Sequence, residues 1–270
     1  YDPASQLTSL TYPDGRVVGQ TYDAAGRLVA VSDGSGHTST FSYDGDSNLT
    51  VESLPNRVSL SMGYDANDEL TSFVYNLPGI GGVGLGYTRD ARGLLTSANG
   101  AGYSYDASGR LLSSSSDSSS YGYNSANDLT SSVIGGVTST YGYDAAHEVN
   151  SITTGTSTTA VAHDPEGELI AMVGGGLGGQ SFSYDQGGHL TSATTTGPTA
   201  TYTYDATGLL NSETVNGVTQ NFTWNQAQGL PTLLSNGSDD LIYGPEGTPI
   251  EQVNPGGATY YLLGDELAVG

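Results

Sequence analysis

A seven-residue phrase, Tyr-Asp-x-x-Gly-x-Leu, recurs along the whole 270-residue chain and constrains its fold more than any other feature. A fixed period is the signature of an architecture built from stacked, similar units. Most of the units lie 19 to 21 residues apart. The thirteen units begin at Tyr1, Tyr22, Tyr43, Tyr64, Arg89, Tyr105, Tyr123, Tyr143, His163, Tyr184, Tyr204, Trp224 and Tyr243.

Each column of the phrase has its own chemistry. Position one is Tyr in ten units, position two is Asp in ten, and position seven is Leu in eleven. Position five is Gly, or one of Ser, Asn, Asp, His and Gln, which predicts a left-handed backbone conformation there. The residues that we assign to this structural repeat are Tyr22, Asp23, Gly26, Leu28, Tyr43, Asp44, Leu49, Tyr105, Asp106, Gly109, Leu111, Tyr184, Asp185, Gly188, Leu190, Tyr204, Asp205, Gly208 and Leu210.

The residues around the phrase alternate as in a β-strand. An apolar residue often stands two positions before position one, as Phe41 does before Tyr43, and period two indicates a strand. Each unit is therefore predicted to be a β-hairpin whose Asp side chain holds the turn. Because an isolated hairpin cannot bury its face, we expect an all-β fold in which antiparallel hairpins stack as a spiral, solenoid or shell-like sheet, with their aromatic rings in one shared column. Residues 1–270 would form a single repeat domain.

Charge and composition exclude several classes of function. The net charge is −22, which would repel phosphate backbones and anionic membranes, so neither nucleic-acid binding nor membrane insertion is expected. No run of residues is apolar enough for a spanning helix. The chain has no Cys and no Lys, which excludes disulfides, thiolate nucleophiles and lysine Schiff bases. This composition suits a secreted, extracellular or cell-surface protein.

Candidate sites were weighed against structural explanations. The stretch from Asp44 to Asn48 begins like a calcium loop, but Leu49 and Pro55 stand where that loop needs Gly and Glu. Adventitious calcium between turn aspartates is the remaining metal hypothesis. The acidic pair Glu166 and Glu168 belongs to a predicted turn. No catalytic, cofactor-binding or metal site is therefore assigned.

Three further patterns have mainly structural interpretations. His163 stands at position one, where most units have Tyr. We therefore expect it to pack in the ring column rather than act as a base. Two glycine-rich runs, residues 78–86 and 174–179, lack the following helix and the Lys of a phosphate loop. Tight bends or bulges of the sheet are the better interpretation of both runs.

The phrases Tyr-Asp-Ala-Ala-Gly-Arg-Leu at 22–28 and Tyr-Asp-Ala-Ser-Gly-Arg-Leu at 105–111 resemble the YD repeats of Rhs proteins, toxin-complex shells and teneurins. The resemblance implies a spiral sheet, which in larger relatives closes into a hollow shell around a toxin or into a cell-surface barrel. Residues 259–270 resemble the lead-in to the Rhs core. The self-cleaving aspartates and the variable toxin end of that family are not among these residues, so no catalytic residue is carried over.

The sequence thus favours a structural, non-enzymatic, extracellular segment that forms the wall or shaft of a shell, tube or fibre. Two alternatives stay open: a fragment of a toxin-encapsulating Rhs cocoon, and a carbohydrate- or cell-surface-binding adhesion module. The expected partners are further copies of the chain or further chain of the same parent protein, with an encapsulated toxin or surface glycans under the alternatives. No cofactor is expected.

Overall fold

The computed structural model describes residues 1–176, 178–227 and 229–263. Apart from one short 3-10 turn, η1 (Pro245–Gly247), every regular element in this part of the chain is a β-strand. The all-β prediction is confirmed. The first eight strands are β1 (Ser9–Thr11), β2 (Val17–Tyr22), β3 (Leu28–Ser32), β4 (Thr38–Tyr43), β5 (Leu49–Ser53), β6 (Ser59–Tyr64), β7 (Leu70–Leu77) and β8 (Gly81–Arg89).

The strands that follow continue the same pattern, with position one closing a strand and position seven opening the next. They are β9 (Leu95–Ala98), β10 (Ala101–Tyr105), β11 (Leu111–Ser114), β12 (Ser119–Tyr123), β13 (Leu129–Ile134), β14 (Val137–Tyr143), β15 (Val149–Thr154), β16 (Ser157–His163), β17 (Leu169–Gly174), β18 (Gln180–Tyr184), β19 (Leu190–Thr194), β20 (Thr199–Tyr204), β21 (Leu210–Val215) and β22 (Val218–Asn221). The C-terminal strands are β23 (Thr223–Asn225), β24 (Thr232–Ser235), β25 (Asp240–Tyr243), β26 (Pro249–Val253) and β27 (Thr259–Tyr261).

Most strands that follow each other in the sequence pair antiparallel, as β4 and β5 do, whereas β22 and β23 belong to different sheets. Strands β1 to β22 belong to a 22-stranded sheet, and β23 to β27 form a five-stranded sheet. The register shifts by one residue at the tyrosine that precedes each turn, for example between Ser42 and Tyr43. A repetitive antiparallel hairpin sheet, as the sequence predicts, is therefore what the chain forms.

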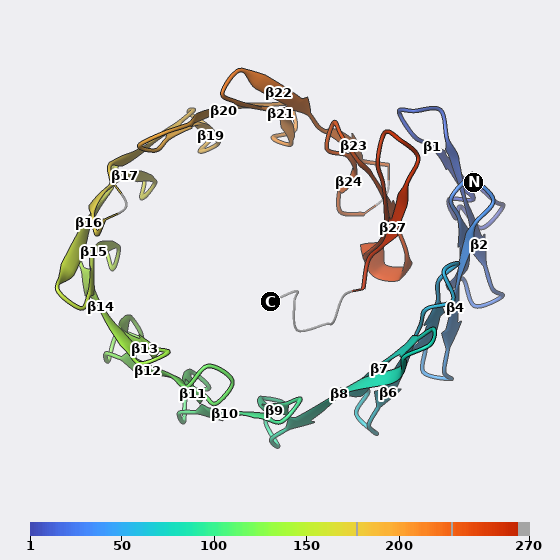
Figure 1. Cartoon of the computed structure of the whole chain (residues 1–270), viewed down its shortest axis with the longest axis horizontal. Helices are drawn as coiled ribbons and strands as arrows, with labels where there is room; N and C mark the ends of the chain where they lie inside the picture. Colours follow the sequence, from blue (N-terminus) through green and yellow to red (C-terminus); the bar gives the residue numbers. More distant parts are fainter. Residues whose placement is uncertain (177, 228, 264–270) are drawn as a thin grey trace. The chain divides into compact units, whose positions relative to one another are not determined.

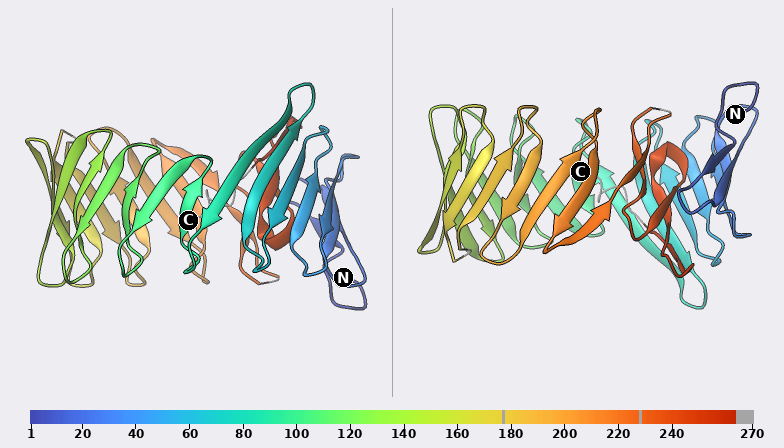
Figure 2. Two further views of the ribbon diagram at one scale, coloured as in Figure 1. Left: turned by 90° about the horizontal axis from the view of Figure 1, so that it is seen from below. Right: turned by 90° about the horizontal axis from the view of Figure 1, so that it is seen from above.

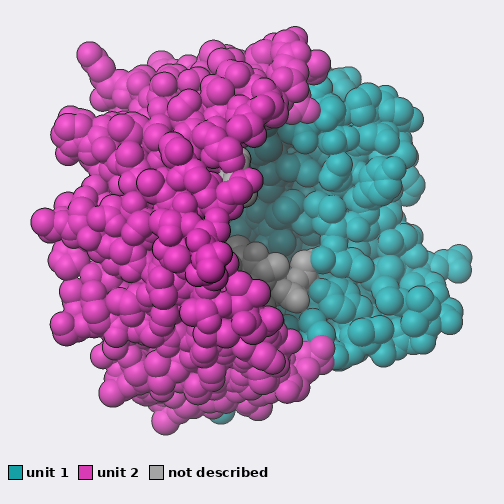
Figure 3. Space-filling view, turned by 60° about the vertical axis from the view of Figure 1, so that its left-hand side comes forward, with its two compact units in different colours: residues 1–87, 221–270 teal, residues 88–220 magenta. Residues whose placement is uncertain are grey.

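The chain divides into two compact units (Figure 3). Unit 1 comprises Tyr1–Tyr87 and Asn221–Gly270, and unit 2 comprises Thr88–Gln220. Each unit is described by itself below. The single repeat domain expected over residues 1–270 stays a prediction.

Unit 2 is a curved sheet one layer thick (Figure 1). Among its described residues, Ala98 is the only hydrophobic side chain that is buried, and its other buried side chains are small serines and a threonine. Tyrosines such as Tyr121, Tyr143 and Tyr204 are only half-buried. In the described part of unit 2, therefore, no second layer covers either face, and its cohesion comes from contacts along the sheet.

Unit 1, by contrast, has two layers and a hydrophobic core. The five-stranded C-terminal sheet lies against β2 to β4, and Val31, Phe41, Ile242 and Ile250 are at most 4% exposed between them. The other buried members of this cluster are Tyr12, Val18, Leu234 and Val253. Burial of these side chains supplies hydrophobic stabilisation that unit 2 lacks.

The glycine-rich run at 78–86 begins with a tight turn, as one of the two interpretations predicts, and has no bulge: the Ile80 N–H donates to the Leu77 carbonyl at 3.1 Å. Strand β8 takes up residues 81–89 and pairs with β7 in unbroken register, from Ser72 opposite Gly86 to Leu77 opposite Gly81. The extra residues lengthen this hairpin, which reaches beyond its neighbours in unit 1 (Figure 2). The second run, at 174–179, joins β17 to β18, and its Leu177 lies outside the described residues.

The proposed lead-in to the Rhs core, residues 259–270, is described in part. Strand β27 covers its first three residues and pairs with β26, with Tyr260 opposite Gln252. Residues 264–270 lie outside the described part of the chain, so the lead-in stays a prediction.

Candidate functional site

The turn of each unit is built by its Asp and its position-five residue. In the second unit, the Asp23 N–H donates to the Arg27 carbonyl and the Gly26 N–H donates to the Asp23 carbonyl, both at 3.0 Å. This is a type I turn followed by a left-handed residue, the usual way to close such a hairpin with a bulge. All twelve described residues at position five have positive φ, from 61° to 87°, which confirms that prediction; Gln228 lies outside the described residues.

The Asp side chain performs the predicted structural task. Asp23 Oδ1 accepts the N–H groups of Ala25 at 2.9 Å and of Arg27 at 3.0 Å. The same pair of bonds forms at Asp44, Asp106, Asp185 and Asp205. Because ionised carboxylates accept N–H bonds better than neutral ones, the backbone bond from position six is the first cause that lowers the pKa of Asp23, Asp106 and Asp185.

The remaining residues of the assigned repeat take matching places in every unit. Gly26, Gly109, Gly188 and Gly208 are the left-handed residues of their turns. The position-seven residues Leu28, Leu49, Leu111, Leu190 and Leu210 each begin the next strand. Tyr105, at position one, ends β10 and is half-buried.

In seven units the tyrosine of position one connects its unit to the one before it, a role that the sequence did not suggest. Tyr43 in β4 donates its hydroxyl proton to the carbonyl of Leu28, the position-seven residue of the preceding unit, at 2.7 Å. The same bond joins seven successive pairs over 2.7 to 3.1 Å: Tyr22 to Leu7, Tyr43 to Leu28, Tyr64 to Leu49, Tyr123 to Leu111, Tyr143 to Leu129, Tyr184 to Leu169 and Tyr204 to Leu190. We call these bonds the phenol–carbonyl ladder.

The expected column of ring on ring is wrong for these tyrosines. Two strands separate position one in successive units, so the rings lie about 9–10 Å apart, beyond the ~4.5–7 Å of an aromatic pair. Other groups cover the rings: the Arg27 guanidinium lies 4.9 Å from the ring centre of Tyr43, and the His189 ring stacks on Tyr204 at 4.7 Å. The unit-to-unit contact is thus a side chain at position six against the next tyrosine.

Position six also connects neighbouring turns. Arg27 pairs with Asp23 at 2.8 Å and donates to the Asp44 carbonyl of the next turn at 2.9 Å. Arg110 repeats this arrangement, donating to Asp106 at 2.6 Å and to the Asn124 carbonyl at 3.2 Å. The recurring Gly-Arg-Leu of the phrase was the signal that could have revealed these links.

Replacing Tyr43 by Phe is expected to lower the unfolding free energy of unit 1 by about 1 kcal/mol, because the Leu28 carbonyl, in a partly buried bond, loses its donor while the ring stays. Urea unfolding followed by the fluorescence of Trp224, the single tryptophan, reports on unit 1 because this residue lies in β23. Tyr260→Phe is the control, since Tyr260 is exposed and its hydroxyl has no hydrogen-bond partner among the described residues. Equal midpoints for both variants would show that the ladder adds no stability.

Two glutamates inside unit 1, Glu52 and Glu251, are buried. Glu251 is fully buried; its Oε1 accepts the Ser39 hydroxyl at 3.0 Å, and burial raises its pKa. Glu52 lies opposite Phe41, and burial raises the pKa of its carboxyl from 4.5 to about 7. The burial of these two side chains could not be predicted from the residue type, because Glu is usually exposed.

Glu52 is expected to make unit 1 less stable as the pH rises. Below about 4.5 the carboxyl is neutral in both the folded and the unfolded state, whereas above about 7 the folded state must bury a charge. This contribution to stability is therefore complete below 4.5 and is lost as the pH rises through 7. Glu52→Gln should remove the loss, so its stability advantage over the natural chain should grow from pH 4.5 to 8; a constant difference would contradict the assignment.

The sites considered from the sequence do not converge on a catalytic arrangement. Glu166 and Glu168 lie on one turn, where the backbone N–H of each donates to Asp164 Oδ1. His163 Nδ1 lies 3.8 Å from Glu148 Oε2 at the end of β16. Within the described ranges, no three His, Asp or Glu side chains group as metal ligands, and no helix is long and apolar enough to span a membrane.

Sheet, turns and ladder together define a YD-repeat protein, and family models agree with this. The RHS repeat model matches residues 1–38 and 22–59, and the teneurin YD-shell model matches residues 111–222. Over these segments the chain matches models of the RHS/YD-repeat family. A search of curated protein sequences found no match.

The chain is similar to solved structures at low sequence identity. The Tc holotoxin pore of Photorhabdus luminescens, with a mutated TccC3, is 15% identical with a TM-score of 0.50, and the match covers 98% of this chain and 19% of that one. The crystal structure of TcdB2-TccC3-TEV is 15% identical with a TM-score of 0.49, covering 93% of this chain and 18% of that one. This chain therefore spans about a fifth of the length of these structures.

Proposed function

We propose that this chain is a stretch of wall in a YD-repeat cocoon that encloses a polypeptide cargo. The observation that carries the proposal is the single layer of unit 2, whose strands hold together without a hydrophobic core. A single-layer sheet of this kind is suited to a wall, with an interior on one face and solvent on the other. The fold likeness to a Tc holotoxin component over 98% of this chain favours a cocoon over an open fibre or tube.

The hydrogen bonds of the sheet explain how so thin a wall would hold. Units add strand pairing and a closed turn, and seven of the thirteen also add a phenol–carbonyl bond to the unit before them, so cohesion grows with the number of units. In such a repeat each unit depends mainly on its neighbours. A wall can then be lengthened by adding units without enlarging a core.

The same proposal covers the catalytic activity, the location and the partners of this segment. A cocoon wall needs no catalytic group, so we propose that this segment is not an enzyme. The excess of 28 acidic over six basic residues gives a soluble, mutually repelling surface that suits a secreted or cell-surface assembly. Its partners would be the remaining wall of the same protein and the enclosed cargo.

Limited proteolysis of the full-length protein that carries this segment tests the proposal. A cargo portion inside a closed wall should resist a protease that digests the same portion rapidly once the wall is unfolded in urea. Mass spectrometry would identify the protected fragment. Cleavage of all non-wall portions at one rate, with or without urea, would contradict enclosure, and open-ended growth in light scattering would favour a fibre instead.

A further inference from the structure

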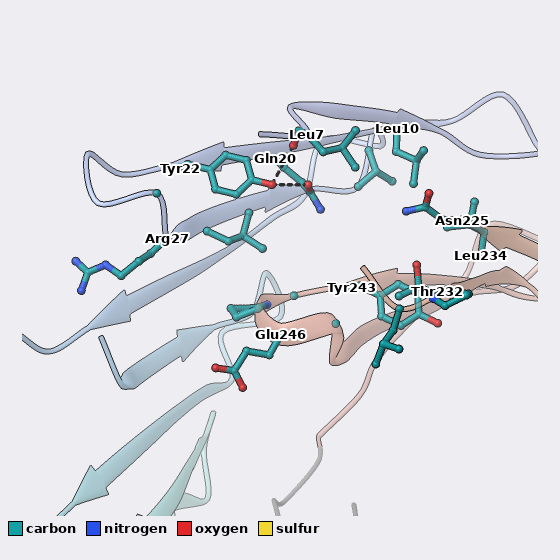
Figure 4. A pocket seen from close by; sticks show the side chains of 18 of the residues that line it. Leu7, Leu10, Gln20, Tyr22, Arg27, Asn225, Thr232, Leu234, Tyr243 and Glu246 are labelled. Carbon is teal, nitrogen blue, oxygen red and sulfur yellow. Dashed lines mark hydrogen bonds between the residues drawn. The ribbon is translucent and has the colours of Figure 1, made fainter. Parts of the chain in front are cut away.

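Unit 1 contains a cavity of about 760 Å³ between its first strands and the C-terminal segment (Figure 4). Tyr22 and Arg27 lie on the N-terminal side, and Thr232, Tyr243 and Glu246 lie on the opposing segment. The volume falls in the range of ~300–1,000 Å³ that small-molecule sites occupy. A ligand could occupy this cavity without breaking the strand pairing, the Asp-closed turns or the phenol–carbonyl ladder.

The surface of the cavity is formed mainly by rings and aliphatic groups, because its tyrosine hydroxyls already donate hydrogen bonds to backbone carbonyls. Tyr22 donates to the Leu7 carbonyl at 3.1 Å, and Tyr243 donates to the Leu233 carbonyl at 2.7 Å. Tyr12 and Tyr43, also in the lining, donate to backbone carbonyls as well. The aliphatic part of the lining comes from Leu7, Leu10, Val18, Leu28 and Leu234. These bonds fix the rings in place, so the site is pre-formed.

The lining contains two charged side chains, and only one of them is neutralised. Arg27 forms an ion pair with Asp23 at 2.8 Å and covers the ring of Tyr43. Glu246 is exposed at the edge of the cavity and has no ion-pair or hydrogen-bond partner among the residues that the structure describes. The cavity thus combines fixed aromatic rings with one unpaired carboxylate.

We propose that this cavity binds an organic cation with an apolar or aromatic body. The body would lie among the tyrosines and leucines, and the ammonium group would lie beside the Glu246 carboxylate and the ring faces, both of which attract cations. An anion would be repelled by that carboxylate and by the negative field of a chain whose net charge is −22. The inference concerns unit 1 alone and does not depend on the cocoon.

Two probes of similar shape and opposite charge test the proposal: phenylbutylamine and phenylbutyrate. Saturation-transfer NMR titration of the chain should detect binding of the amine and much weaker binding of the carboxylate. Glu246→Gln should weaken the amine by about two- to fivefold, as expected of a solvent-accessible ion pair. Glu246→Lys should reverse the preference between the two probes.

Glu166→Gln is the matched control, since Glu166 lies in an equivalent Pro-Glu-Gly turn of unit 2 and not in the cavity lining. It removes the same charge and should leave amine binding unchanged. Trp224 fluorescence melts would show that unit 1 of each variant is folded. Equal binding of both probes, or equal loss of amine binding in Glu246→Gln and Glu166→Gln, would overturn the proposal.

Discussion

Replacing Phe41 by Ala is expected to lower the unfolding free energy of unit 1 by about 3–5 kcal/mol. The Phe41 side chain is 4% exposed and belongs to the core between β2–β4 and the C-terminal sheet. Its removal takes away hydrophobic contact and leaves a cavity that two hydrogen-bonded sheets cannot close. Urea unfolding followed by Trp224 fluorescence measures the loss, since Trp224 lies in the C-terminal sheet.

Phe182 provides a matched control, because it occupies the same place in its own unit, two residues before Tyr184. It lies in the single layer of unit 2 and is only half-buried. Phe182→Ala should therefore cost about 1 kcal/mol, seen by hydrogen exchange in β18, and should leave the Trp224 transition in place. Equal losses at the two positions would show that the C-terminal sheet does not cover Phe41 in solution.

Restoring the common Asp at Gly244 is expected to destabilise unit 1 by at least about 3 kcal/mol. Gly244 is position two of the last unit, where ten others have Asp, and it is buried. A Cβ atom there would lie 2.8 Å from Ile250 Cγ2 and 3.2 Å from Phe41 Cζ. The substitution therefore forces a carboxylate into the core without a partner.

Asn225→Asp is the corresponding control, since Asn225 holds position two of the preceding unit and accepts the Ala227 N–H at 3.0 Å. An Asp can accept the same bond, so its effect should stay within about 0.5 kcal/mol. The two variants bring the sequence equally close to the repeat consensus. Similar stability of both, measured by urea unfolding, would contradict the packing of Phe41 against Gly244.

Local features of this fold were predictable from the sequence because a few adjacent residues determine them. The Asp-closed turn and its left-handed fifth position depend on seven consecutive residues, and the repetition of that phrase identified the hairpin sheet. The phenol–carbonyl ladder was not predicted because it joins neighbouring units, and Tyr, unlike Phe, was interpreted only as bulk for burial. Strand spacing then rules out the ring-on-ring column that the same tyrosines suggested.

The second layer of unit 1 was not predictable because distant segments form it. Gly244 departs from the Asp of position two, and it lacks a side chain where Phe41 packs. Glu52 and Glu251 are buried as well, and their burial depends on the packing of unit 1 rather than on residues adjacent in the sequence. The cavity beside Glu246 likewise depends on how residues near both ends of the chain pack together.

Electron cryo-microscopy of the full-length protein that carries this segment tests the cocoon most directly. The expected image is a hollow particle whose wall, over the unit 2 residues, is one β-sheet thick, with density for polypeptide in its interior. A filament, or a solid particle in which both faces of the unit 2 sheet are covered by other folded domains, would contradict the proposal.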